Sequence, residues 1–262
     1  TPAGETLYDQ SLEMLQALQS TRAMLRGHTS AGQDVIEFAV PHTLAFTFFP
    51  AWVSGLREKF GPIKSRLIAL NVHDAVMSLA EGGCDLMLCY HHPQQPLLLD
   101  PAQYEMISMG TEALRAYSRC DKSGVPDFTL PGTIEEPLPF LAYANNAYLG
   151  RMVDLILNQT RQALHFDKCY ETDMAEGLKM MALEGRGVAF LPESAVVREL
   201  KQKQLARADG GSDAWEVSME IRLYRERPSE QRPGKAVVAK LWDYLAQKSQ
   251  LSSKSKTVKS QR

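Results

Sequence analysis

The 262-residue sequence has no apolar run long enough to cross a bilayer, which takes about 20 predominantly apolar residues. It also lacks the basic and then apolar start that directs a chain to secretion. Cysteines are few, and their spacing forms neither a disulfide framework nor a standard zinc pattern. These absences predict a cytoplasmic protein with free thiols and no membrane partner. The four cysteines are Cys84, Cys89, Cys120 and Cys169.

Motifs of enzymes and nucleotide-binding proteins are missing as well. Ser194 and His165 are present, but no serine has the strand-to-helix context of a hydrolase nucleophile. Gly185-Arg186-Gly187 lacks the third glycine of a dinucleotide-binding loop, and it precedes a predicted strand instead of following one. The sequence therefore predicts a protein that is not an enzyme and that needs no cofactor.

The body of the chain also lacks a surplus of basic residues. The net charge is −2, and residues 248–262 contribute five positive charges and no acid, so the remainder carries −7. A body with this balance does not suit binding to nucleic acid. The Ser- and Lys-rich residues 248–262 are predicted to form a disordered basic tail, with contact to polyanions as the alternative.

What the chain does contain is a regular alternation of short apolar runs and amphipathic stretches. Strands are predicted at residues 35–40, 65–71, 85–90, 104–109, 113–118, 140–143, 165–171, 188–191 and 215–224, and helices at 44–60, 75–81, 148–163, 172–184, 194–203 and 235–247. The short links indicate parallel sheets covered by helices, in two successive α/β units of similar size.

Before these units, residues 1–26 have the pattern of a long amphipathic helix. A heptad seam with alternating spacings of four and three residues, and with two polar positions in it, runs through Leu7, Ser11, Met14, Leu18, Thr21 and Leu25. The polar flank of this helix indicates that its apolar face meets a partner helix, either in a second copy or in the body of the same chain.

Several motifs in this order resemble the LysR-type transcriptional regulators. Residues 1–5 (TPAGE) are similar to the start of the family's linker helix, and residues 34–90, with Pro50 inside a helix, resemble its first regulatory subdomain. Residues 182–193 (ALEGRGVAFLPE) resemble its C-terminal motif. Residues 141–151 (LAYANNAYLGR) further resemble the branch of the hypochlorite-responsive regulator.

The resemblance implies an α/β fold with two Rossmann-like subdomains of the periplasmic-binding-protein type II architecture, preceded by a long linker helix. Two strands would cross between the subdomains, near residues 112–118 and 219–224. The implied divisions are a linker helix at 1–30, subdomain I at 33–112 and 219–247, subdomain II at 113–218, and the tail at 248–262. DNA would be read by a winged helix-turn-helix before residue 1, and the protein would be a homodimer or homotetramer.

In this architecture a small polar or anionic effector binds in the cleft between subdomains, where strand-to-helix junctions offer free N–H groups. The implied effector-binding residues are His42, Thr43, Leu44, His73, Tyr143, Asn145, Asn146, Thr172 and Asp173. No arginine or lysine stands at these junctions in the sequence, which favours recognition by hydroxyls, amides and backbone N–H groups. Helix capping is the alternative role for Thr43 and for Asp74.

Two other functions remain open at this point. An oxidant sensor could work through Met or Cys oxidation, since sulfoxidation makes an apolar methionine polar, although plain core packing also explains most methionines. The redox candidates are Cys84, Cys89, Cys120, Cys169, Met106, Met109, Met180 and Met181. A solute-binding protein would share the fold, but the heptad helix and free cysteines disfavour it.

Overall fold

The computed structural model describes residues 34–160, 162–230 and 232–259, with residues 1, 3–4, 7–8, 10–11, 14 and 32 before them. The predicted linker helix at 1–30 lies outside the continuously described residues. Within the described part of the chain, no helix is long and apolar enough to cross a membrane.

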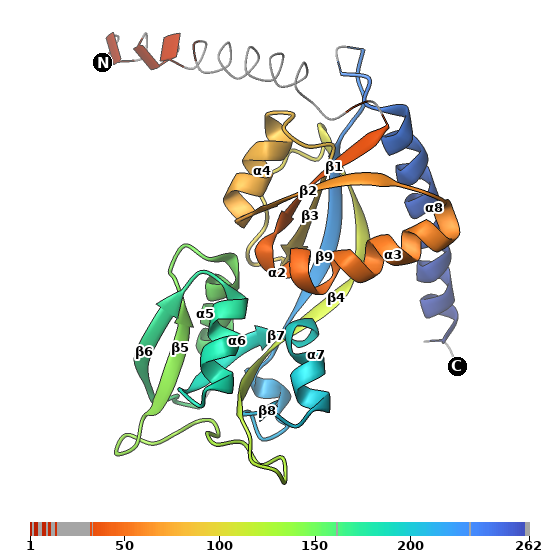
Figure 1. Cartoon of the computed structure of the whole chain (residues 1–262). Helices are drawn as coiled ribbons and strands as arrows, with labels where there is room; N and C mark the ends of the chain where they lie inside the picture. The colour runs from red at the N-terminus through yellow and green to blue at the C-terminus, as the bar shows by residue number, and fades with distance from the viewer. Residues whose placement is uncertain are drawn as a thin grey trace.

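The described strands form one mixed sheet in the order β2-β1-β3-β9-β4-β7-β5-β6, with β8 paired to β4 (Figure 1). The strands are β1 (Val35–Pro41), β2 (Lys64–Leu70), β3 (Leu86–His91), β4 (Tyr104–Arg119), β5 (Leu138–Tyr143), β6 (Phe166–Thr172), β7 (Val188–Pro192), β8 (Leu205–Arg207) and β9 (Val217–Glu226). β1 is parallel to β2 and β3, and β5 is parallel to β6 and β7. The long β4 and β9 run antiparallel through the middle.

Helices divide with the strands into two lobes (Figure 1). The helices are α2 (His42–Thr47), α3 (Phe49–Phe60), α4 (Val72–Ala80), α5 (Tyr148–Gln159), α6 (Ala175–Leu183), α7 (Glu193–Lys201), α8 (Ala236–Lys259) and the short 3-10 helix η1 (Asp213–Trp215). The first lobe contains β1–β3, α2–α4 and α8. The second lobe contains β5–β8 and α5–α7, and β4 and β9 join the two.

The first lobe shows why its strands read as continuous apolar runs. Neighbouring residues of β1 point to opposite faces of the sheet, and both faces are covered by helices. On one face Phe38 makes edge contacts with Phe49 and Trp52 of α3, at ring-centroid distances of 5.1 and 5.7 Å. On the other face Ala39 packs in a smaller cluster with Leu79 of α4. Every residue of β1 after Val35 is consequently buried.

The predicted α/β fold is confirmed, but two elements differ from the expected pattern. The helix predicted at 44–60 is divided at Phe48, because Pro50 has no N–H to donate and is suited to the first turn of α3. The strands predicted at 104–109 and 113–118 are one strand, β4, with a register shift between Ser108 and Gly110. Gly110 has φ 135°, which lets the strand bend without ending.

The C-terminal end of the chain also differs from the expectation. Residues 248–262 were predicted to be disordered, whereas α8 continues to Lys259. No glycine or proline follows Lys235, so nothing in the sequence interrupts the backbone hydrogen bonds of the helix. The short elements β8 and η1 were not predicted, because three residues carry too little periodicity to be recognised.

Candidate effector site between the lobes

The junction after β1 lies at the first lobe's edge facing the second lobe. His42 is half-buried, while Thr43 and Leu44 are buried in the first turn of α2. Thr43 makes no side-chain cap of this helix. Its backbone carbonyl instead accepts a 2.9 Å hydrogen bond from the Thr47 hydroxyl, one turn later. The short helix α2 also contacts α7 of the second lobe, so this junction is at the boundary between lobes.

The matching junctions of the second lobe are held together by strand pairing. Tyr143 is paired in register with Thr172, and Ala144 N donates to the Thr172 carbonyl at 2.9 Å. Tyr143 is buried, whereas Asn145 is exposed. Asp173 and Asn146 are exposed at the same edge.

A cation does reach this second-lobe junction, contrary to the expectation from the sequence. Arg151 donates to the Asn146 carbonyl at 3.1 Å, and its guanidinium lies 5.5 Å from the ring centroid of Tyr148. The sequence prediction missed it because Arg151 stands five residues after Asn146, in the first turns of α5, and the helix brings the side chain back towards its own N-terminus.

The junction after β2 serves to cap α4. Asn71, rather than Asp74, is the N-cap residue, and its side chain accepts a 2.8 Å hydrogen bond from Asp74 N. The Asp74 carboxylate in turn accepts a 2.7 Å bond from the Asn71 amide. The pair resembles a capping box, except that the Asp74 carboxylate accepts from the side-chain amide of Asn71 and not from its backbone N–H. His73 is exposed beside it.

Two cavities adjoin the boundary between the lobes. One, of about 600 Å³, lies among α2, α6 and α7, and the other, of about 640 Å³, lies among α3, β4 and α8. We call them the α6–α7 cavity and the α3–α8 cavity. Thr47 and Ser194 line both, so the end of α2 and the start of α7 separate them. Among the described residues, none of the nine predicted effector-binding residues lines either cavity.

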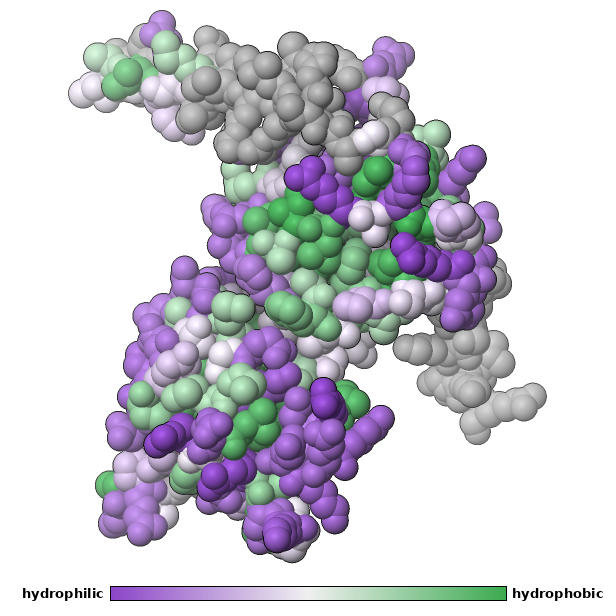
Figure 2. Space-filling view, in the orientation of Figure 1, coloured by the Kyte–Doolittle hydropathy of each residue, from purple (hydrophilic) through white to green (hydrophobic). Residues whose placement is uncertain are grey.

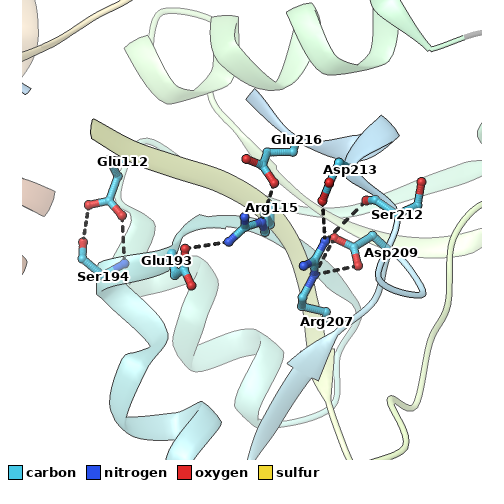
Figure 3. A network of polar contacts seen from close by, with 9 residues as sticks. All are labelled: Glu112, Arg115, Glu193, Ser194, Arg207, Asp209, Ser212, Asp213 and Glu216. Atoms are coloured by element: carbon cyan, nitrogen blue, oxygen red, sulfur yellow. Dashed lines mark hydrogen bonds and ion pairs between the residues drawn. The ribbon is translucent and has the colours of Figure 1, made fainter. Parts of the chain in front are cut away.

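Ser194 is fixed by a buried carboxylate on the connecting strand β4 (Figure 3). The Ser194 backbone N–H donates to Glu112 at 2.9 Å, and its hydroxyl donates to the other carboxylate oxygen at 2.6 Å. Glu112 is only 7% exposed. Burial raises the pKa of Glu112, while the two bonds from Ser194 oppose the rise. The carboxylate therefore occupies the N-terminus of α7, where an anion is favoured.

Two buried phenols lie on the boundary near this carboxylate. The Tyr143 hydroxyl has no hydrogen-bond partner among the described residues, and the Tyr90 hydroxyl has none of good geometry, although Thr47 lies near enough to it to oppose the rise of its pKa. Burial raises the pKa of both phenols, and the charges of Glu112 and Tyr143 raise the pKa of Tyr90 further. An unpaired buried hydroxyl is costly, and such groups in native proteins call for an explanation, such as a ligand or ordered water.

Two arginines of the second lobe are paired with carboxylates (Figure 3). Arg115 on β4 donates at 2.6 Å to both Glu193 and Glu216, which joins the first turn of α7 to the start of β9. Arg207 on β8 bonds Asp209 at 2.9 Å. These pairs attach the second lobe's loops to its strands, and a different arginine, Arg198 of α7, lines the α6–α7 cavity.

The redox candidates are dispersed over both lobes. Cys84 and Cys89 are buried, and burial raises the pKa of each thiol to about 12, which disfavours the reactive thiolate. Cys120 is half-buried, and only Cys169 among the four free cysteines is exposed. Of the methionines, Met106 and Met180 are exposed, and Met109 and Met181 are half-buried.

Four residues at the boundary were absent from the sequence prediction: Thr47, Tyr90, Glu112 and Ser194. A signal existed for Ser194, because it follows a buried strand and opens a helix, as the four chosen junctions do. Glu112 was detectable only as an acid beside the apolar Ala113-Leu114 pair on a predicted crossing strand. Tyr90 ends a fully apolar run and gave no polar signal.

Comparison with known sequences decides the family. The sequence profile of the LysR substrate binding domain matches residues 30–250. The chain belongs to the LysR family. The predicted resemblance is confirmed, and so are the assignment as the effector-binding domain of a transcriptional regulator and the exclusion of an enzyme.

LysR-family relatives match most of the chain. The HTH domain-truncated transcriptional regulator QseD of Escherichia coli O157:H7 is 31% identical over 202 residues, which are 77% of this chain and 79% of QseD. The regulator YjiE of Escherichia coli K12 is 30% identical over 77% of this chain and 63% of YjiE. The apo regulatory domain of HypT from Salmonella typhimurium has 26% identity and a TM-score of 0.68, covering 83% of this chain and 96% of that one.

Proposed function

We propose that this LysR-family domain senses a small effector at the boundary between its lobes and transmits binding as a change in lobe arrangement. The observation that carries this proposal is that two cavities of ligand size share Thr47 of the first lobe and Ser194 of the second. A ligand touching both residues has a different affinity for each spacing of α2 and α7. Only such a difference in affinity can shift the population of two arrangements.

We propose that subdomain I comprises residues 33–112 and 219–247 and that subdomain II comprises residues 113–218. We also propose that the protein works in the reducing cytoplasm, which its four unpaired cysteines favour. A related structure supports a site for a small species in such a domain, since the HypT regulatory domain was also solved with bromide bound. That regulatory domain is 25% identical to this chain. In our proposal the predicted residues Thr43 and Tyr143 contribute by shaping the boundary, and Thr47 and Ser194 provide the contact surface.

The experiment is a thermal-unfolding screen of the purified chain against a library of small metabolites. A ligand at 100 times its Kd adds about 2.7 kcal/mol, a rise in Tm of roughly 5–10 °C for a domain of this size. Ser194→Leu, which fills both cavities, should abolish the rise. Ser54→Leu, at an exposed serine of α3 that lines neither cavity, is the matched control. Hits that still bind Ser194→Leu would refute the location.

We propose further that a winged helix-turn-helix segment outside residues 1–262 reads DNA, in the same polypeptide or a partner subunit. The acidic balance of the body supports this, because DNA binding needs basic surface. The described chain alone should not retard duplex DNA in a gel at about 150 mM salt. Retardation by the chain alone would contradict the proposal that a separate segment binds DNA.

Homo-oligomer formation is part of the same proposal. β2 is an edge strand of the sheet, and its Leu67 is partly exposed, as is Phe46 on α2. Figure 2 shows hydrophobic residues gathered on the front of the first lobe, between β2 and α3, with hydrophilic residues around them. Exposed apolar surface next to an unpaired strand edge is typical of an interface. Sedimentation of Leu67→Lys should show a shift towards monomer that Leu98→Lys, on an exposed loop, does not.

Oxidant sensing is the second candidate function, and the exposure of Met106 and Met180 favours it. A full-length relative, HypT, is described as hypochlorite-specific and is 27% identical to this chain. Treatment with hypochlorite followed by mass spectrometry should find sulfoxide at Met180 and Met106 before the buried methionines such as Met87 and Met152. If the oxidised chain keeps both the Tm and the oligomeric state of the untreated chain, and oxidised Met180→Leu does the same, oxidation does not regulate this domain.

A further inference from the structure

We propose that the turn at residues 92–95 is a latch that attaches the first lobe to α5 of the second lobe and sets the spacing of the two lobes. This inference rests on the proposed function, in which effector binding changes the arrangement of the lobes. It names a contact that such a change has to break or keep. Among the described residues, none that makes this contact lines either cavity.

The turn is ordered by its own hydrogen bonds. The Gln95 backbone N–H donates to the His92 carbonyl at 2.9 Å, and the Gln94 backbone N–H donates to His92 Nδ1 at 3.2 Å. Pro93 lies inside the turn and Pro96 follows it, and each proline has a fixed φ. The turn therefore loses little further conformational entropy when it binds α5.

The turn contacts α5 through residues at both ends of this helix. The hydroxyl of Tyr148, the first residue of α5, donates to the Gln95 carbonyl at 3.5 Å. The amide of Gln159, the last residue, donates to the side-chain oxygen of Gln94 at 3.0 Å. These two helix residues are roughly 16 Å apart along the axis, at a rise of 1.5 Å per residue. Two bonds to separate parts of α5 oppose its rotation about either bond, which a single bond does not.

These bonds join the lobes independently of the connecting strands. Residues 92–95 follow β3 of the first lobe, and α5 packs on β5 of the second lobe. The bonds between Ser194 and Glu112, in contrast, attach α7 to β4, which extends into both lobes. The latch can therefore open while the pairing of β4 with β9 stays intact, and the lobes then turn about these two strands.

Arg151 connects the latch to the polar junction after β5. Its guanidinium lies 5.5 Å from the ring centroid of Tyr148 and donates to the Asn146 carbonyl at 3.1 Å. The predicted effector-binding residues Asn145 and Asn146 are exposed at this junction. A ligand that draws Arg151 away from the Tyr148 ring would remove a contact that orients the phenol towards Gln95. The latch thus lies where occupancy of the junction can release it.

The test measures the distance between the lobes by pulsed electron spin resonance. One spin label is attached to the exposed Cys169 of β6 and the other to Ser54→Cys of α3, in a chain that also carries Cys120→Ser, and the two buried cysteines stay unlabelled. An excess of unlabelled chain restricts the signal to distances within one chain. Gln159→Ala should increase the population of a second interlobe distance roughly twofold to tenfold, as expected from the loss of one hydrogen bond.

Gln94→Ala removes the other partner of the same bond, and the double variant should show no larger change than either single variant. Tyr148→Phe removes the second bond, keeps the ring beside Arg151, and should change the distances in the same direction. Asn158→Ala, at the exposed neighbour of Gln159, is the matched control and should change nothing. Additive effects of Gln94→Ala and Gln159→Ala, or control-like distances in Gln159→Ala and Tyr148→Phe, would overturn the latch. Because this experiment uses no ligand, its outcome is independent of the ligand screen that tests the proposed function.

Discussion

Lys235 should be one of the most sensitive positions for the stability of the first lobe. It stands directly before α8, and its ammonium group lies 2.8 Å from Asp85, 3.0 Å from the Val35 carbonyl and 3.4 Å from Glu37. The side chains of Lys235, Asp85 and Glu37 are only 12%, 16% and 10% exposed, respectively. The lysine thus attaches the start of α8 to the beginnings of β1 and β3. We expect Lys235→Met to break this attachment while keeping the volume of the side chain.

The cost follows from what the substitution leaves behind. Removing one member of a buried ion pair costs about 3–5 kcal/mol, since the remaining charge is buried without compensation. Arg66 lies 3.2 Å from Glu37 and still compensates that carboxylate, but Arg66 is 58% exposed and its contribution is small. Lys235→Met should therefore lower the free energy of unfolding by about 2–4 kcal/mol at neutral pH.

The loss should depend on pH through Asp85. Burial raises the pKa of Asp85 in the folded protein, despite its bond from Lys235. An acid whose pKa is higher in the folded state takes up its proton more readily there, so folding is favoured as pH falls through that raised value. Without Lys235 the pKa of Asp85 rises further. The loss in free energy of unfolding caused by Lys235→Met should consequently be largest at pH 7 and become smaller as the pH approaches about 4.

Urea unfolding followed by circular dichroism at pH 7 and pH 4 measures this deficit directly. Lys240→Met is the matched control, since Lys240 is an exposed lysine of the same helix. Its substitution should change the free energy of unfolding by less than about 0.5 kcal/mol. A loss for Lys235→Met no larger than that of the control, or a loss that is the same at both pH values, would refute the role of the buried ammonium group.

Three further predictions concern single positions. Gly187→Ala should cost more than about 2 kcal/mol in urea unfolding, because φ is 155° and a Cβ would stand 2.3 Å from the Pro139 carbonyl oxygen. Asn71→Ala should cost about 1 kcal/mol by loss of the cap, with Asn71→Asp retaining stability. In thiol labelling with an aromatic disulfide, exposed Cys169 should react quickly and buried Cys89 only on unfolding.

The fold was predictable because its signals are local. The apolar runs of β1 and β3 are continuous since helices cover both faces, and Pro, Gly and polar pairs separate them from the helices. The division between α2 and α3 was not predicted, although Pro50 supplied the reason. Periodicity alone cannot tell a helix that continues from one that restarts in nearly the same direction. The sequence likewise did not predict that β4 continues through Gly110, since a glycine is compatible both with the end of a strand and with a bulge inside it.

The candidate site was less predictable because its members are joined by long-range pairing. Glu112 and Ser194 are 82 residues apart, and neither belongs to a motif. The prediction selected junctions by polarity, and one of its residues, Thr43, lies in α2, the helix that contacts α7 of the second lobe. It also selected His73, which is exposed beside the Asn71 cap of α4. Residue type cannot distinguish a polar side chain that caps a helix from one that faces a ligand.

The contacts of α7 indicate how a ligand at Ser194 could act on the whole domain. Two bonds to Glu112 and an ion pair from Arg115 to Glu193 attach the first turn of α7 to β4, so this turn moves with the connecting strand. The helix α2, in contrast, packs against β1 and β2 of its own lobe. In the proposed function, a ligand that touches both Thr47 and Ser194 would therefore act on the first lobe through α2 and on the connecting strand β4 through α7, because Ser194 is bonded to Glu112.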